Sequence, residues 1–297
     1  MNKFDFLNKK NKKPKRVVIL GSSGIIVKNL SSLLKKKQIN FITLGSKKIN
    51  LKKPDIYSNI LRKKIKKNDC ILFLAAEAPV KSFRVLINNI EILKTVITAI
   101  EPKKISHLIY ISSDAVYSDV KNKITESTQT IPDSYHGTMH ITREKILESY
   151  FSKKLCILRP TMIYGINDTH DGYGPNKFVR LIKNNQNIKL FGRGEERRDH
   201  IYIGDVIKII FKCITRKAAG KLNLASGNVV SFKEIADILI KKIKTKSKIK
   251  YVKRVGPLQH NGFRPFNVKL LKIFFKEIKL KNVKIGINNF YGDLTWR

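Results

Sequence analysis

Short runs of apolar residues alternate with longer stretches in which apolar residues recur every three or four positions. The short runs lie at residues 16–20, 39–44, 69–74, 107–111 and 155–158. Between them, helical periodicity predicts helices that follow residue 24 and that span residues 80–99 and 134–153. Strands that alternate with helices form parallel βαβ units, so the sequence predicts an α/β protein with a doubly wound parallel sheet.

The regular alternation ends after residue 164. The segment 165–176 is rich in Gly, Asp and Asn. Helical patterns then return at residues 205–215 and 231–243, and short strands are expected at 222–224 and 249–252. We therefore divide the chain into a basic tail (1–15), a first domain (16–164) and a smaller C-terminal α+β lobe (165–297). This lobe is expected to be interleaved with the last strand and helix of the first domain.

Lysine dominates the polar positions. The 297 residues include 61 Lys and Arg against 22 Asp and Glu, which gives a formal net charge of +39. With 42% hydrophobic residues, the chain is too apolar to be a disordered polycation. The lysines are spread over nearly every polar segment without interleaved aromatic residues, so we expect no specific nucleic-acid binding, while charge-driven polyanion binding stays open. Residues 9–16 form a local basic cluster that is expected to fray.

Three cysteines, Cys70, Cys156 and Cys213, lie in apolar runs far apart in the sequence. This distribution is typical of reduced core thiols rather than of a disulfide framework. No paired Cys and His spacing predicts a metal site. The longest apolar runs are far shorter than the roughly 20 residues of a membrane span, and the N-terminus has no signal-peptide stretch. We therefore expect a cytoplasmic protein with no membrane span and no metal.

A glycine turn follows the first predicted strand, and it reads Gly21-Ser22-Ser23-Gly24-Ile25. A helix that begins at such a turn points its unpaired N–H groups and its positive dipole end at a bound anion, so the turn suits a pyrophosphate. Val27 stands where a third glycine is normally found. The position of the turn after the first strand predicts a Rossmann-like dinucleotide site.

The end of the second predicted strand bears on which dinucleotide is bound. An acid at this place usually binds the ribose 2′-hydroxyl of NAD, whereas the 2′-phosphate of NADP needs basic or hydroxyl groups. The chain has no acid there but has Ser46 and Lys47. We therefore expect NAD or NADP, with a slight preference for NADP.

Several further motifs follow in a fixed order. They are Leu74-Ala75-Ala76, Asn89, Ile111-Ser112-Ser113-Asp114-Ala115-Val116-Tyr117, Arg159-Pro160, Tyr164-Gly165, Leu190-Phe191-Gly192, Arg198-Asp199 and Asn223-Leu224-Ala225-Ser226-Gly227. Together with the glycine turn, they resemble the extended short-chain dehydrogenase/reductases, and among these the NAD-dependent epimerase/dehydratase family that modifies nucleotide sugars. The resemblance implies that the first domain binds NAD(P) and that the second lobe binds substrate. The implied cofactor residues are the glycine turn, Ser46, Lys47, Leu74, Ala75, Ala76, Asn89, Ile111 and Ser112.

The catalytic helix of the family carries a Tyr-x-x-x-Lys pair, and a hydroxyl of the preceding segment, matched here by Ser113, also acts on the sugar. The equivalent helix here has His136 at the Tyr position and His140 at the Lys position. A register that starts at Tyr135 does not restore the pair either. The two histidines lie one turn apart on one face, and imidazole titrates near neutrality, so His136 or Tyr135 is a candidate proton shuttle. His140, if protonated, would supply the positive charge and a hydrogen bond to the ribose.

This departure leaves two interpretations. The histidines either support an altered catalysis, or the chain is a non-catalytic NAD(P)-binding sensor or scaffold of the same fold. The persistence of Ser113 and of the substrate-side motifs favours an enzyme. In the family's 4,6-dehydratases a Glu follows the Asp of the hydroxyl segment, but here Ala115 follows Asp114. An epimerase or a reductase is therefore preferred.

Residues on the substrate side match groups that bind a nucleoside diphosphate in the family. They are Asn176, Arg198 and Arg264, and the guanidinium fork of arginine suits phosphate oxygens. The resemblance implies a nucleotide-sugar substrate, a role in the supply of surface polysaccharide or lipopolysaccharide, and a homodimer as one candidate assembly.

Overall fold

The computed structural model of the protein describes residues 3–168, 172–243 and 245–295. The chain forms two compact units, which are described separately. The first unit comprises Met1–Ser118, Glu126–Pro160 and Ile207–Asn223, and the second comprises Asp119–Thr125, Thr161–Val206 and Leu224–Arg297.

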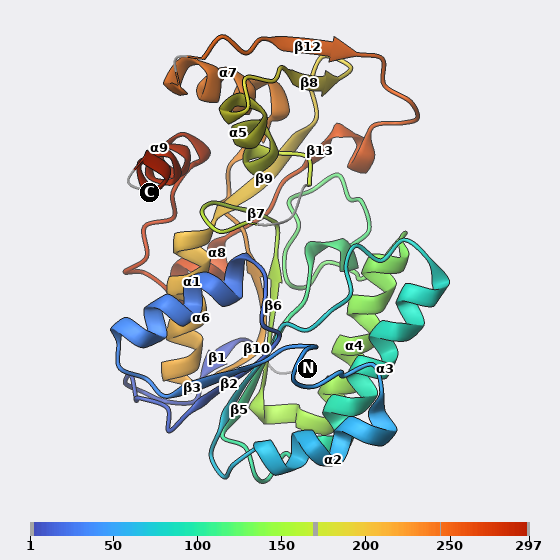
Figure 1. The fold of residues 1–297 in the computed structure, drawn as a ribbon, viewed down its shortest axis with the longest axis vertical. Helices are drawn as coiled ribbons and strands as arrows, with labels where there is room; N and C mark the ends of the chain where they lie inside the picture. Colours follow the sequence, from blue (N-terminus) through green and yellow to red (C-terminus); the bar gives the residue numbers. More distant parts are fainter. Residues whose placement is uncertain (1–2, 169–171, 244, 296–297) are drawn as a thin grey trace. The chain divides into compact units, whose positions relative to one another are not determined.

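A seven-stranded sheet forms the centre of the first unit, in the order β3-β2-β4-β5-β6-β10-β1 (Figure 1). The strands are β1 (Asp5–Phe6), β2 (Val17–Leu20), β3 (Phe41–Leu44), β4 (Cys70–Phe73), β5 (His107–Ile111), β6 (Leu155–Pro160) and β10 (Ala218–Leu224). Strands β2 to β6 pair in parallel. Every residue of β2 and β4 is buried, as expected for parallel strands that are covered on both faces. The predicted doubly wound α/β fold is confirmed.

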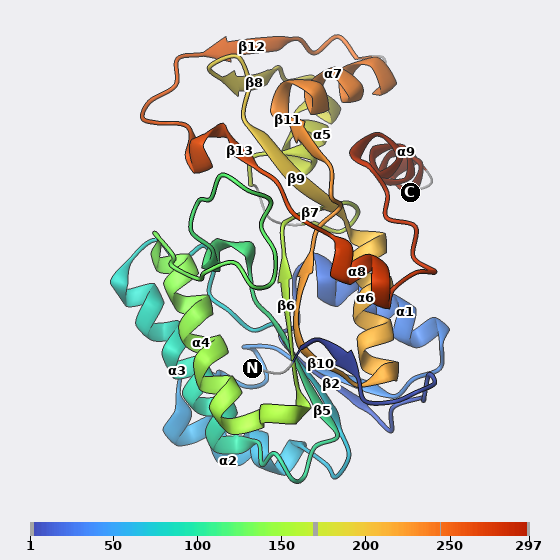
Figure 2. The same ribbon diagram turned by 180° about the vertical axis from the view of Figure 1, so that it is seen from behind.

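Helices cover both faces of this sheet. Figures 1 and 2 show α1 (Ile25–Lys36) and α6 (Ile203–Arg216) on one face, and α2 (Pro54–Lys64), α3 (Phe83–Ala99) and α4 (Tyr135–Phe151) on the other. Short 3-10 turns, η1 (Asp114–Val116) and η2 (Ser152–Lys154), flank α4 in the sequence. Serine hydroxyls cap α3 and α4, because Ser82 accepts from the Val85 N–H and Ser134 accepts from the Gly137 N–H.

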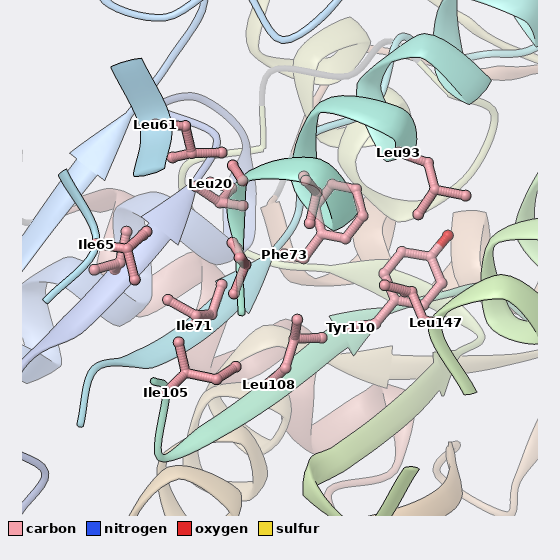
Figure 3. Close-up of a cluster of buried hydrophobic side chains, with 14 of the residues drawn as sticks. Leu20, Leu61, Ile65, Ile71, Phe73, Leu93, Ile105, Leu108, Tyr110 and Leu147 are labelled. Carbon is pink, nitrogen blue, oxygen red and sulfur yellow. The ribbon is translucent and has the colours of Figure 1, made fainter. Parts of the chain in front are cut away.

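The apolar core of the first unit lies between the sheet and the helices α2, α3 and α4. Figure 3 shows side chains of β2, β4 and β5 that contact residues of these helices and of the adjoining loops. The labelled residues are Leu20, Leu61, Ile65, Ile71, Phe73, Leu93, Ile105, Leu108, Tyr110 and Leu147. This packing fixes the ends of the strands, from which the loops of the candidate site extend.

The order of the strands creates a switch point at β2. The chain passes from β2 to its neighbour β3 and then crosses back over β2 to reach β4 on the other side. In open α/β sheets, ligands bind outside the carboxyl ends of the strands at such a switch point. The ends of β2 and β4 therefore mark the expected ligand site of the first unit.

The second unit is built around β9 (Arg197–Tyr202). This strand pairs in parallel with β7 (Met162–Tyr164) and β13 (Phe263–Arg264) and antiparallel with β11 (Val229–Ser231). A separate parallel pair is formed by β8 (Ile188–Phe191) and β12 (Ile249–Val252). The helices of this unit are α5 (Pro175–Lys183), α7 (Phe232–Ile243), α8 (Lys269–Phe274) and α9 (Val283–Thr295), with the 3-10 turn η3 (Gln259–Gly262).

Residues just before and within the basic cluster 9–16, which was expected to fray, are bonded to the rest of the first unit, and at its end Arg16 donates to Asp69 at 2.9 Å. Strand β1 pairs antiparallel with β10, and the N–H groups of Leu7, Asn8 and Lys12 donate to carbonyls at the end of α6 and just after it. The guanidinium carbon of Arg216 lies 4.6 Å from the centre of the Phe6 ring. Backbone pairing and this cation–π contact therefore hold a segment whose lysines alone would favour solvent.

A buried ion pair joins α4 to the sheet. Glu144 and Arg159 are almost completely buried, and the Arg159 Nε donates to the Glu144 carboxylate at 2.9 Å. The same carboxylate accepts a 2.6 Å hydrogen bond from the Ser112 hydroxyl at the end of β5. Arg159 also donates to the Tyr117 hydroxyl at 2.7 Å. Each charge is therefore compensated within the core of the first unit.

Removing one partner of this pair should destabilise the protein strongly. The variant Arg159→Met removes the nearer cation of the buried Glu144 carboxylate and leaves the Lys221 ammonium at 3.8 Å, and we expect a loss of about 3 kcal/mol in the free energy of unfolding. Urea unfolding followed by circular dichroism measures this loss. The double variant Glu144→Leu, Arg159→Met should lose less than the single variant. Equal losses would show that the cost is one of volume and not of charge.

Candidate active site

A pocket of about 290 Å³ lies at the carboxyl ends of β2, β3 and β4. Among the expected cofactor residues, its lining includes Gly21, Ser22, Ser23, Ser46, Leu74, Ala75 and Ala76. Gly24, Ile25, Lys47, Asn89, Ile111 and Ser112 do not belong to this lining. The structure thus brings together the glycine turn after β2 and the loop after β4, which are about 50 residues apart in the sequence.

The backbone of the glycine turn requires glycine at two places. Gly21 and Gly24 have φ angles of 122° and 97°, which side chains of L-residues rarely permit. A Cβ on Gly24 would meet no atom within 4 Å, so the space over the start of α1 is open. No side chain in the described part of the chain caps the first turn of α1. Its N–H groups are therefore free of side-chain caps, as a phosphate site needs.

Gly45 and Ser22 form the part of the pocket wall where β2 and β3 end. A Cβ on Gly45 would lie 1.8 Å from the Ser22 Oγ, so only glycine fits beside the turn. The Lys52 ammonium pairs with the Glu77 carboxylate at 3.1 Å, and both residues also line the pocket. Neither residue was predicted to belong to the site. Nothing in the local pattern marks Lys52 or Glu77, because they meet only through the strand order.

Asn89 holds the loop after β4 in place instead of lining the pocket. Its side-chain amide donates to the Glu77 and Val85 carbonyls, and its carbonyl oxygen accepts from the Glu77 N–H at 3.1 Å. Ser112 is likewise buried, and its hydroxyl is bound to Glu144. Ile111 is buried at the end of β5. The side chains of Asn89 and Ser112 are thus already hydrogen-bonded to other residues of the protein. The geometry therefore does not favour the direct contact with a cofactor that the sequence predicted for them.

Ser113 lies at the start of η1, where its hydroxyl accepts from the Ala115 N–H at 3.1 Å. Helix α4 packs closely against this turn. A Cβ on Gly137 would lie 2.1 Å from the Ala115 carbonyl oxygen, so the approach requires glycine. The first turn of α4, which carries Tyr135 and His136, is therefore held directly against the segment that carries Ser113.

The three candidate residues of α4 have different environments. Tyr135 is exposed, His136 is half-buried, and His140 is buried. The rings of His136 and His140 meet edge to face, with their centres 4.7 Å apart. The Tyr110 hydroxyl lies 2.7 Å from the His140 Nδ1. Burial raises the pKa of Tyr110, so the hydroxyl keeps its proton near neutral pH.

The positive charge expected of His140 is not supported by its surroundings. Burial holds the pKa of His140 well below its usual value, and the neighbouring His136 and Arg143 lower it further. His140 is therefore neutral near pH 7. An imidazole in this state supplies no fixed charge at the position where the related helices have lysine.

The substrate-side residues all lie in the second unit and are engaged there. Arg198 donates to Glu196 at 3.1 Å, and Arg264 donates to Asp119 at 2.7 Å. Asn176 uses its amide on the backbone of one residue, accepting from the Gly165 N–H and donating to the Gly165 carbonyl. Asn176 therefore holds the turn after β7. Among these three residues, Arg198 and Arg264 carry positive charge.

The described residues add two further observations. None of their helices is both long and apolar enough to cross a membrane. Among the same residues, no three His, Cys, Asp or Glu side chains gather as a metal site would need.

Comparisons with known proteins agree with the fold. Residues 17–225, which are more than half of the chain, match the model of the NAD dependent epimerase/dehydratase family. The chain is 31% identical over 194 residues to an uncharacterized UDP-glucose epimerase, YtcB, of Bacillus subtilis, with 61% of this chain and 57% of that protein covered. It is 25% identical over 214 residues to the dTDP-D-glucose 4,6-dehydratase of Mus musculus, with 67% and 60% covered. The matches thus span less than two thirds of the length of these two relatives.

Solved structures of similar architecture include the UDP-glucuronic acid 4-epimerase of Bacillus cereus in complex with UDP-glucuronic acid and NAD. The TM-score is 0.78 at 18% identity, and 93% of this chain and 98% of that chain are covered. At this identity the likeness shows the fold alone.

The neutral state of His140 predicts a pH dependence of stability. Its pKa in the folded protein lies below the value of about 6.5 in the unfolded chain, so protons bind preferentially to the unfolded chain as the pH falls below 6.5. Stability contributed by the neutral ring is therefore present above pH 6.5 and is lost on acidification. Between pH 7.5 and 5.5, His140→Gln should reduce the acid-induced loss in the free energy of unfolding by about 1.3 kcal/mol.

Urea unfolding of both proteins at the two pH values measures this difference. His107, whose pKa burial lowers to about 4, stays in both proteins and contributes equally to each. An identical pH dependence of the two proteins would show that the pKa of His140 is the same in the folded protein as in the unfolded chain, which contradicts the prediction.

Proposed function

The chain belongs to the NAD-dependent epimerase/dehydratase family, and we propose that it uses NAD or NADP to epimerise or reduce a nucleotide-activated sugar. The observation that carries the proposal is the pocket in which the glycine turn after β2 meets the loop after β4. An uncapped helix start and two glycines with positive φ fit the diphosphate of a dinucleotide. The bound nicotinamide would supply the hydride chemistry.

The proposed reacting groups of the protein are Ser113 and the first turn of α4. The Ala115 N–H fixes the Ser113 hydroxyl, which would bind the reacting oxygen of the sugar. His136 or Tyr135 would take up or release the proton that accompanies hydride transfer. Ala115 stands where dehydratases of the family carry glutamate, which supports epimerisation or reduction over dehydration. Arg198 and Arg264 would bind the diphosphate of the substrate, and the turn that Asn176 holds would support them.

The slight preference for NADP rests on the wall at the end of β3. Ser46 lines the pocket there, whereas Lys47 does not, and the Lys52 ammonium that also lines the pocket is paired with Glu77. The Ser46 hydroxyl suits a 2′-phosphate, and no acid follows β3 to bind a 2′-hydroxyl. Structural relatives such as the Bacillus cereus epimerase hold NAD, so both dinucleotides belong to the test.

A non-catalytic NAD(P)-binding sensor or scaffold is the second candidate. The specific observation in its favour is the neutral, buried His140 at the position of the family's lysine. This candidate retains the pocket but needs no proton exchange at His136.

Our proposal of an enzyme further includes a cytoplasmic homodimer that supplies sugar nucleotides for surface polysaccharide or lipopolysaccharide, as the family resemblance suggests.

Cofactor binding followed by turnover tests the proposal. The protein is titrated with NAD, NADP and their reduced forms, and the complexes are then incubated with UDP-, GDP- and dTDP-sugars. Nicotinamide absorbance reports reduction, and chromatography of the recovered sugars reports epimerisation. For the active sugar class, His136→Ala should lower kcat by about 10²- to 10⁴-fold, because the proton-transfer group is lost. Ser113→Ala should also lower kcat.

The control variant is Ser32→Ala, which removes a hydroxyl on α1 that is bonded to the Lys28 carbonyl, and we expect it to leave kcat unchanged. Dinucleotide binding with no turnover of any sugar would select the sensor. No binding of any dinucleotide would overturn both candidates.

A further inference from the structure

Arg143 is a buried cation that neither the motifs nor the proposed reaction uses. It lies on α4 seven residues after His136 and three after His140, so all three side chains share one face of the helix. Its exposed fraction is 0%. Burial lowers the pKa of Arg143, but the ordinary value for arginine is so high that the side chain stays charged. A full positive charge therefore lies inside the first unit.

The hydrogen bonds of Arg143 all lead to uncharged acceptors. Its guanidinium donates to the Asn89 carbonyl at 2.7 Å, to the Asn89 side-chain oxygen at 2.9 Å and to the Ala75 carbonyl at 2.9 Å. Within the described residues, no carboxylate forms an ion pair with it. Arg159, the other fully buried arginine of this region, differs because Glu144 neutralises it. The charge of Arg143 thus has dipoles around it but no counter-ion.

The acceptors of Arg143 belong to the wall of the pocket or directly support it. Ala75 lines the pocket. Asn89 bonds to both the N–H and the carbonyl of Glu77, which lines the pocket as well. The guanidinium therefore lies directly behind the loop after β4. A buried charge without a counter-ion is weakly screened, so it favours an anion in the pocket that Ala75 and Glu77 line.

We propose that Arg143 is a positioning residue that holds the loop after β4 and supplies the fixed positive charge that favours the diphosphate of the dinucleotide. The inference rests on the proposed function, because it assigns the anionic part of the proposed cofactor to this pocket. It adds a source of charge that lies outside the glycine turn. The diphosphate serves as the counter-ion that the protein does not provide.

Ligands that differ in charge separate this role from a structural one. Arg143→Gln removes the charge but keeps an amide donor, whereas Arg143→Lys keeps the charge but loses the forked geometry. We expect Arg143→Gln to weaken binding of ADP and NAD by about 3- to 10-fold and to leave the affinity for adenosine, which has no phosphate, unchanged. Arg143→Lys should restore most of the affinity. Isothermal titration calorimetry measures these values, and circular dichroism confirms that each variant is folded.

Lys154 offers a matched control. Its ammonium also donates to two backbone carbonyls, those of Pro102 and Ile105, but it precedes β6 and so lies at the opposite end of the parallel strands from the pocket. Lys154→Met should leave all affinities unchanged. The salt dependence of ADP binding, measured on the unaltered protein and on Arg143→Lys, provides a readout even where Arg143→Gln fails to fold.

The outcomes are distinct. Binding of ADP and NAD that Arg143→Gln leaves unchanged would overturn the inference while the proposed function stands. Equal weakening of adenosine and ADP, with no rescue by lysine, would show a purely structural role and would also overturn the inference. If Arg143→Gln does not fold, the unaltered protein and Arg143→Lys are compared instead. The inference is overturned if these two proteins bind ADP no more tightly than adenosine and with no greater salt dependence. An unaltered protein that binds neither NAD nor ADP would overturn the proposed function and this inference together.

Discussion

The buried carboxylate of Glu144 determines how α4 lies on the sheet. It receives hydrogen bonds from Ser112 at the end of β5 and from Arg159 on β6, so two neighbouring strands hold one point of the helix. Gly137 then sets the distance of the first turn from η1, because no larger residue fits against the Ala115 carbonyl. One ion pair and one steric contact thereby fix which face of α4 points toward the ends of the strands. The positions of His136, His140 and Arg143 follow from these two constraints.

The two buried arginines near α4 show how the same charge can have different consequences. Arg159 is compensated by Glu144, and its contribution is to join a helix to the sheet. Arg143 donates hydrogen bonds to the carbonyl oxygens of Ala75 and Asn89. These bonds lower the cost of burying the guanidinium but leave its net charge in place. A compensated pair produces little field beyond its own contacts, whereas an uncompensated charge acts on the neighbouring pocket. Within the same region of the core, Arg159 thus contributes to stability, whereas Arg143 contributes to the preference for an anionic ligand.

Local pattern was sufficient to predict the architecture of the first unit. The periodicity of apolar residues gave the alternation of strands and helices, and Gly21 and Gly24 have the positive φ angles that the predicted turn requires. The partners of polar side chains could not be predicted in this way. The motifs identified Asn89, Ser112 and Asn176 by position, but their side chains bond to segments that only the tertiary fold brings near. No motif assigns a role to Arg143. Its buried charge becomes informative only in the tertiary structure, where the described residues provide no carboxylate to pair with it.

The state of His140 sets a condition on any catalysis by α4. In the resembling family, the lysine at this position holds the nicotinamide ribose and lowers the pKa of the catalytic tyrosine. Here the ring is neutral, and its Nδ1 lies 2.7 Å from the Tyr110 hydroxyl, so it cannot lower the pKa of a neighbouring group by charge. The nearest buried cation on the same face, Arg143, lies almost one turn further along and is directed to Ala75 and Asn89. The buried positive charge on this face of α4 therefore lies beside the pocket wall and not at the position of the family's lysine. A proton shuttle on the first turn of α4 consequently acts without the charge that the family's lysine supplies to a catalytic tyrosine.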